Sequence, residues 1–246
     1  MEATLYLIPV ALGETGFLRA LPAFNRGVIL SLKYFIVEEV RSARRFLKKV
    51  APEIVIDGLH FFEWNEHTPS EEVSRLLAPL AVGESVGLLS EAGCPAVADP
   101  GAEVVALAHR KGYRVMPLVG PSSIVMALMA SGLNGQRFAF HGYLPVEAAQ
   151  RALCLKALEA RMMAEDETQI FMETPYRNNK LLRDLVSILK PATQLCIAAE
   201  LTCTDEFIKT RAVKEWAGEI PDLHKKPAIF LIGQTPGAER KKTFDK

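Results

Sequence analysis

The stretch LLSEAGCPAVADPG (residues 88–101) passes from two leucines through acids, glycines and prolines and leads directly into the apolar run EVVALA. If SVGLLS (85–90) is a buried parallel strand, the residues after it lie beyond its carboxyl end, where open α/β sheets bind ligands. Gly93 allows the backbone to approach a ligand closely, and Pro95 keeps the loop stiff. A strand-to-helix turn without a ligand also favours Gly, Pro and Asp, so this loop alone leaves both interpretations open.

The helix that follows this loop has clear end signals. Asp99 is a suitable N-cap and Pro100 a suitable first helical residue, and Gly112 suits the helix end.

A second corner repeats the arrangement in PLVGPSSIVMALMASGL (117–133). The chain turns at Gly120-Pro121 and offers Ser122 or Ser123 as a cap. It then enters a helix that is apolar on nearly every face and is expected to be buried. Two such corners would place backbone N–H groups and hydroxyls around one cleft.

Short apolar runs alternate with helical patterns over the first half of the chain, which predicts a parallel sheet with crossover helices. The expected strands cover residues 5–10, 34–39, 53–57, 85–90 and 113–118.

The second half has a different pattern. Its apolar runs, for example QLCIAAEL and EFIKTRAV, are joined too briefly for helical crossovers, so some pairs are expected to be antiparallel. Helices are expected near 147–164 and 176–190. The sequence therefore predicts two α/β domains, residues 1–119 with a parallel Rossmann-like sheet and residues 120–246 with a mixed sheet.

Composition excludes several classes. The chain has 246 residues, 49% of them hydrophobic, which is enough for a large core. Basic and acidic residues both number 29, so no overall charge attracts nucleic acid or an anionic membrane, and any polyanion site must be local.

The four cysteines lack the spacing of a zinc site or a disulfide scaffold, and no metal site is predicted. The start MEATLYLIPVAL has no basic region before its apolar run, and no stretch is long enough to span a bilayer. We therefore expect a cytoplasmic protein that does not enter a membrane.

Residues 40–50 have helical periodicity, with an apolar stripe formed by Val40, Ala43, Leu47 and Val50. The other faces carry Arg41, Arg44, Arg45, Lys48 and Lys49. These five cations form either a solvated helix surface or a local phosphate-contacting patch.

An ordered series of motifs then resembles the tetrapyrrole methylase superfamily: SEAGCPAVADPG, PLVGPSS, ASGL, FHGYLP, METPYR and AELT. Upstream, VEEVR and WNE are similar to the E-D-T-R and H-N-E segments of the branch that methylates a cytidine ribose hydroxyl in small-subunit ribosomal RNA. The resemblance covers about residues 5–234. It implies two α/β domains with S-adenosylmethionine bound in the cleft between them.

The resemblance also implies site residues. For the cofactor they are Pro9, Ser90, Glu91, Ala92, Gly93, Cys94, Ala96, Ser122, Ser123, Phe171, Met172, Glu173, Glu200, Leu201, Thr202, Pro227 and Ala228. Ordinary strand packing is the alternative for those in the second domain. The implied catalytic residues are Glu39, Arg41 and Glu66, and the implied substrate contacts are Arg44, Arg45, Asn65, Tyr176 and Arg177.

The chain departs from the family pattern in its first loop, IPVALGE, which is shorter and lacks a glycine. It also has S-E-A-G-C-P in place of S-D-A-G-T-P and E-E-V-R in place of E-D-T-R, and, because the sequence ends soon after KPAIFLIGQ, no C-terminal extension is expected. These changes place substrate identity in more doubt than cofactor binding.

Methylation of an oxygen requires a group that accepts the hydroxyl proton. Glu38 and Glu39 lie at the carboxyl end of an expected strand, and one of them pointing inward is the first candidate; capping of the next helix is the alternative for Glu39. Capping likewise competes with substrate contact at Asn65 and Glu66. His141 is expected to be a satisfied, half-buried histidine rather than a base.

Tyr176 and Arg177 follow Pro175 at the start of an expected helix. They either complete a turn or stack on and hold a nucleotide.

The leading hypothesis is a methyltransferase acting on a ribose 2′-hydroxyl of small-subunit ribosomal RNA, and the family is usually homodimeric. A tetrapyrrole or other small molecule is the alternative substrate, and a catalytically inactive regulatory protein with the same fold is the alternative class. A nicotinamide-dependent reductase is disfavoured because no G-x-G-x-x-G follows the first strand.

Overall fold

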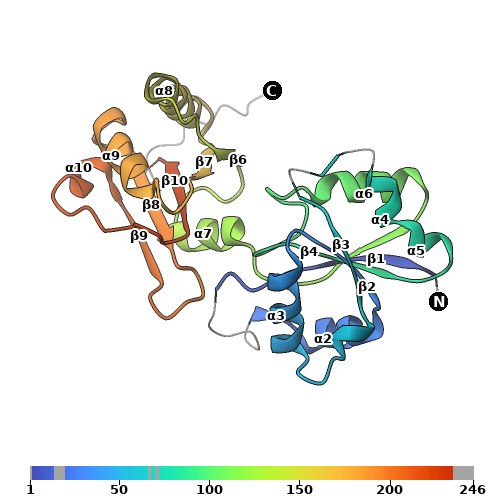
Figure 1. The fold of residues 1–246 in the computed structure, drawn as a ribbon. Coiled ribbons are helices and arrows are strands. Elements are labelled where there is room, and N and C mark those ends of the chain that lie inside the picture. The colour runs from blue at the N-terminus through green and yellow to red at the C-terminus, as the bar shows by residue number, and fades with distance from the viewer. Residues whose placement is uncertain (1, 14–19, 66–67, 70–71, 235–246) are drawn as a thin grey trace. The chain divides into compact units, whose positions relative to one another are not determined.

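The computed structural model describes residues 2–13, 20–65, 68–69 and 72–234 (Figure 1). The chain divides into two compact units, Met1–Ser122 and Ser123–Lys246. The predicted domain boundary lay between residues 119 and 120. In the described part of the chain, no helix combines the length and the apolar character that crossing a bilayer requires.

Unit 1 is built on a five-stranded sheet in the order β3-β2-β4-β1-β5, and every neighbouring pair is parallel. This confirms the predicted parallel sheet. Its strands are β1 (Thr4–Ile8), β2 (Tyr34–Val37), β3 (His60–Glu63), β4 (Val86–Leu89) and β5 (Arg114–Pro117).

Helices cover both faces of this sheet (Figure 1). In β2, Phe35 and Val37 belong to the hydrophobic cluster that includes residues of α2 and α3 on one face of the sheet. Ile36 belongs to the cluster on the other face, with residues of α4, α5 and α6. Strands buried on both faces explain the uninterrupted apolar runs in the sequence. The elements are α2 (Ala23–Ser31), α3 (Val40–Val50), a 3-10 turn η1 (Ile56–Gly58), α4 (Val73–Leu76), α5 (Ala78–Ala81) and α6 (Gly101–Arg110).

The prediction of a strand at residues 53–57 is wrong. The strand at this edge of the sheet is β3, at residues 60–63. Ile54 and Ile56 do pack into the core, but they do so from a loop and from η1. Lys48 Nζ donates to the carbonyls of Pro52 (3.1 Å) and Ile54 (2.7 Å), which holds this segment against α3 in place of a strand partner. Apolar composition revealed the burial of this segment but not its backbone conformation.

Unit 2 contains a second five-stranded sheet, in the order β6-β7-β10-β8-β9. Only β6 and β7 pair in parallel, so the predicted mixed sheet is confirmed. Its elements are α7 (Ser123–Ser131), β6 (Phe138–Tyr143), α8 (Ala148–Glu165), β7 (Thr168–Met172), α9 (Asn178–Ile188), β8 (Gln194–Ala199), β9 (Phe207–Ala212), α10 (Val213–Trp216) and β10 (Ala228–Gly233).

Helix α7 is not buried on every face, contrary to the expectation. Ala127, Leu128 and Ser131 are buried, whereas the side chains of Val125 and Met129 are 47% and 78% exposed. Burial on one face suffices to hold a helix on a sheet, so the apolar residues on the other face remain at the surface of the single chain.

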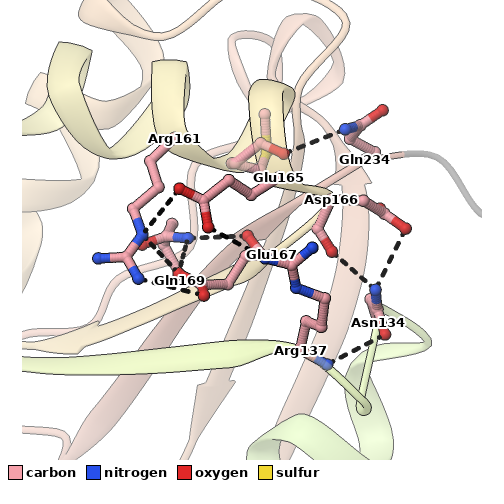
Figure 2. A network of polar contacts seen from close by, with 9 residues as sticks. Asn134, Arg137, Arg161, Glu165, Asp166, Glu167, Gln169 and Gln234 are labelled. Atoms are coloured by element: carbon pink, nitrogen blue, oxygen red, sulfur yellow. Dashed lines mark hydrogen bonds and ion pairs between the residues drawn. The ribbon is translucent and has the colours of Figure 1, made fainter. Parts of the chain in front are cut away.

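A polar network joins the end of α8 to β7 (Figure 2). Arg161 Nε lies 2.8 Å from the Glu167 carboxylate, and Gln169 Nε2 donates to the Glu167 carbonyl at 2.8 Å. On the other side, Gln169 Oε1 lies 2.7 Å from His141 Nε2. His141 is therefore half-buried and hydrogen-bonded, in agreement with its expected structural role.

Candidate active site

Three loops meet at the carboxyl edge of the unit 1 sheet, after the adjacent strands β4, β1 and β5. Val10 and Gly93 exchange two backbone hydrogen bonds of 2.9 Å, which joins the first two loops. Cys94 Sγ donates to the Pro121 carbonyl at 3.4 Å, which joins the second and third loops. The two Gly-Pro corners identified in the sequence therefore lie at one place.

Glycine permits this close approach. Gly93 has a φ of +75°, in the left-handed region that glycine adopts at little cost. A Cβ at Gly120 would lie 2.3 Å from Pro9 Cβ, well inside van der Waals contact. Pro9 is one of the expected cofactor residues, and its ring forms part of the support for the second corner.

The loop after β4 is held by its own side chains. Buried Ser90 donates through Oγ to the Gly93 carbonyl at 3.0 Å. Asp99 Oδ1 accepts from the N–H groups of Ala96 (3.2 Å) and Gly101 (2.6 Å), but α6 begins at Gly101 with Pro100 in the N-cap position, one residue later than predicted. Ala96 and also Ala98 have positive φ values, a strained conformation for alanine that is typical of functional loops.

Glu38 follows β2 and reaches this same edge. Its Oε1 accepts from the Glu91 N–H at 3.3 Å, and its carboxyl lies beside that of Asp99. Burial, and then the neighbouring Asp99 carboxylate, raise the pKa of Glu38 to about 7. Asp99 Oδ2 is buried and has no donor among the described groups, which is expected if a protonated Glu38 supplies one.

Sequence reasoning missed Asp99 as a partner of Glu38 and treated it only as a helix cap. The available signal was positional: both residues follow strands, and β2 and β4 are neighbours in the sheet. That adjacency is decided by the strand order.

Glu39 caps α3. Its carboxylate accepts from the N–H groups of Arg41 (3.0 Å) and Ser42 (2.7 Å). Desolvation acts to raise the pKa of Glu39, but these hydrogen bonds outweigh it and hold the pKa below its usual value. The geometry matches the capping alternative, and Glu39 is a weaker proton acceptor than Glu38.

Asn65 is tied to the same strand end, since its Nδ2 donates to the Glu38 carbonyl at 3.5 Å. Its N–H also donates to Thr68 Oγ1 at 3.1 Å. The side chain of Arg41 is exposed beside Glu39. Glu66, the third expected catalytic residue, lies outside the described residues.

The basic face of α3 borders an open groove of about 580 Å³, lined by Arg44, Arg45, Lys48 and residues 53–57. Arg44 Nη2 lies 3.5 Å from Asp57 Oδ1, and the Lys48 ammonium already donates to two backbone carbonyls. Arg45 is therefore the member of this set best placed for an added anion.

The expected cofactor residues of unit 2 differ in their surroundings. Phe171, Leu201 and Ala228 are buried, and Phe171 stacks on Phe230 in the core at 6.2 Å between ring centroids, which matches the strand-packing alternative. Glu200 and Thr202 differ, because both have positive φ values. The remaining residues are half-buried Met172 and Ser123, buried Glu173, and exposed Pro227, whose carbonyl accepts from the Glu200 N–H at 2.9 Å.

In unit 1, the other expected cofactor residues are accessible. Glu91 and Ala92 are exposed, and Ser122 is half-buried at the end of the second corner. Glu91 Oε1 accepts from Ser42 Oγ at 2.6 Å, so α3 also helps to orient this loop.

Comparison with known proteins agrees with this architecture. A family model described as Tetrapyrrole (Corrin/Porphyrin) Methylases matches residues 29–217. Diphthine synthase has a similar fold, with a TM-score of 0.65 at 17% identity, covering 94% of this chain and 90% of that one. The methyltransferase CobJ has a TM-score of 0.62 at 16% identity, covering 95% and 94%.

Relatives named ribosomal RNA small subunit methyltransferase I match nearly the whole chain. The protein from Mesorhizobium japonicum is 35% identical over 95% of this chain and 76% of its own length. That from Escherichia coli O157:H7 is 31% identical over 94% and 78%. That from Leptospira borgpetersenii is 30% identical over 100% and 94%. The family model and these relatives agree with the parallel and mixed sheets and the hydrogen-bonded corner loops. This chain belongs to the tetrapyrrole methylase family of S-adenosylmethionine-dependent methyltransferases.

Proposed function

We propose that this methyltransferase acts on RNA, at a ribose 2′-hydroxyl of the small ribosomal subunit. The names of relatives at 30–35% identity over most of the chain support the substrate class. The observation that carries the chemistry is Glu38, a carboxyl paired with Asp99 at the carboxyl edge of the sheet, with a pKa near 7. A hydroxyl nucleophile needs such a proton acceptor near neutral pH.

The residues at the corner loops fit the cofactor. Hydroxyls, backbone groups and the exposed Glu91 carboxylate suit a ligand that has ribose hydroxyls, an ammonium group and a sulfonium. We propose that Ser90–Ala96 and Ser122 of unit 1 help to hold it. When bound, S-adenosylmethionine supplies an electrophilic methyl group.

In the proposed reaction the stiff loops hold the reactants in line and exclude water, which is the main requirement of a displacement at a methyl group. Glu38 would accept the proton that the hydroxyl loses on methylation. Asp99 acts through Glu38: its charge raises the pKa of that carboxyl and keeps it close to the working pH.

The test uses small ribosomal subunits from cells that lack this protein. Wild-type protein should transfer labelled methyl to ribose, with a rate that increases as the pH rises through about 7. Glu38→Gln should reduce the rate by about 10²- to 10⁴-fold and abolish that pH dependence.

Asp99→Asn is the matched variant. The Asn carbonyl oxygen retains the hydrogen bonds to Ala96 and Gly101, while the loss of charge should move the pH dependence to lower pH. A Glu38→Gln protein with the wild-type rate at pH 8 would remove Glu38 from the mechanism. Methylation of a tetrapyrrole, with none of ribosomal RNA, would overturn the proposed substrate.

We also propose a cytosolic homodimer. The chain's four cysteines are all free, as reduced thiols in the cytosol are. The exposed apolar side chains of α7, notably Met129, offer a surface for a second copy. Light scattering should give twice the mass of one chain, and a monomer at micromolar concentration would contradict the dimer.

A further inference from the structure

Tyr176 is an exposed aromatic residue set among cations. The residue is 71% exposed, although tyrosine is a residue type of intermediate burial. The ring of His224 meets it edge-on, with ring centroids 5.8 Å apart at an interplanar angle of 76°. Lys225 Nζ lies over the ring, 5.9 Å from its centroid. We call these three residues the Tyr176 cluster.

The loop that carries His224 and Lys225 is fixed to the body of unit 2. Leu223 is 1% exposed and belongs to the core, so it anchors the loop directly beside the cluster. Asn179 Oδ1 accepts from the Leu223 N–H at 2.7 Å, and Asn178 Nδ2 donates to the Lys226 carbonyl at 2.6 Å. The backbone that carries the cations is therefore held in place before any ligand arrives, which reduces the entropy lost on binding.

The tyrosine is held equally firmly. The Lys225 N–H donates to the Pro175 carbonyl at 3.1 Å, and Lys225 has a φ of +62°, a strained value for lysine. On the other side of Tyr176, Arg177 is bound 2.7 Å from the carboxylate of Glu173, which is buried. The chain on both sides of Tyr176 is thus held, while the residue itself stays exposed.

Two lysines supply positive charge next to the ring. Lys225 and Lys226 are both exposed. The nearby acid, Asp222, is engaged by Asn179 Nδ2 (2.7 Å) and by the His224 N–H (3.0 Å). An open aromatic ring beside lysines suits a ligand that has a flat base and a phosphate.

We propose that the Tyr176 cluster binds an unpaired nucleotide of single-stranded RNA, with the base stacked on Tyr176 and the phosphates facing Lys225 and Lys226. This inference rests on the proposed function, because it names the part of the RNA substrate that unit 2 recognises. Stacking requires an unpaired base, so the site selects a single-stranded segment in preference to a duplex.

The probe is a fluorescein-labelled single-stranded RNA of about twelve nucleotides, titrated with the full-length protein. Tyr176→Ala should weaken binding by about 5- to 100-fold, the range for loss of one stacked base. Tyr176→Phe should bind within about twofold of wild type, since it keeps the ring. Lys225→Gln should lower the salt dependence of log Kd by about 0.7, the value for one phosphate contact on a single strand.

Tyr143→Ala is the matched control, because Tyr143 is also an exposed tyrosine of unit 2. It should bind like wild type. Calorimetry with S-adenosylmethionine should give the same affinity for all variants, which shows that they are folded.

This inference would be overturned if wild type and Tyr176→Ala bound the single-stranded RNA with equal affinity, or if wild type did not bind it. Methylation of ribosomal subunits could still be observed in either case, so the proposed function would not be overturned with it. Weaker binding by Tyr176→Ala together with an absence of subunit methylation would support the site and overturn the proposed function.

Discussion

At the scale of single residues, the Glu38–Asp99 pair is the unusual feature. Two adjacent carboxyl groups cannot both ionise cheaply, so one retains a proton near neutral pH. Such a pair lowers stability wherever both groups are forced to ionise. Its persistence at the end of β2 is therefore easier to explain by chemistry than by folding.

This pair makes a stability prediction whose sign can be worked out. The pKa of Glu38 is about 7 in the folded protein, above its usual value of 4.5. The contribution of Glu38 to the stability of the folded protein is therefore fully present below about pH 4.5, and it is lost as the pH rises through about 7. Relative to Glu38→Gln, wild type should lose about 1 kcal/mol between pH 5 and pH 8, after allowance for solvent screening. Urea unfolding of both proteins at the two pH values measures this, and a constant difference would contradict the shared proton.

At the scale of elements, the site depends on loops that pack against one another rather than on any one motif. Gly120 shows this most clearly, because it faces the ring of Pro9 in the loop after β1. Neither the ring nor the backbone can move away without separating the corners.

Gly120→Ala should therefore destabilise the protein by about 1–3 kcal/mol, as overpacking does, and should weaken binding of S-adenosylmethionine. The control is Gly27→Ala in α2, where an added Cβ meets nothing within 4 Å and alanine should stabilise the helix by about 0.5–1 kcal/mol. Thermal melting and calorimetry measure the two effects. Tight cofactor binding by Gly120→Ala would show that the close packing of the corners is not needed.

At the scale of the whole molecule, a chain with no net charge must bind RNA through a local surface. The groove beside α3 is one such surface, with Arg44 and Arg45 on its wall. Helix α6 belongs to the hydrophobic cluster on the other face of the same sheet and ends in Arg110, followed by Lys111.

Reversing Arg44 and Arg45 to Glu should weaken binding to small-subunit ribosomal RNA by at least about tenfold and flatten the dependence of log Kd on log salt by about 1.4–1.8. Reversing Arg110 and Lys111 changes the net charge equally and should leave both quantities near wild type. Lys48 is left unchanged because it supports residues 52–54. Equal effects of the two reversals would indicate a general charge effect and not a binding groove.

The sequence by itself determined the two kinds of sheet, the register of α3 and the location of both Gly-Pro corners, because these depend on local periodicity and on residues with restricted backbone angles. It misplaced the strand at 53–57, because burial there comes from a loop held by Lys48. Only the tertiary structure decided which acid has the raised pKa. The strand order brings Glu38 to Asp99, while local hydrogen bonds at the start of α3 occupy Glu39, and no pattern along the chain encodes that difference.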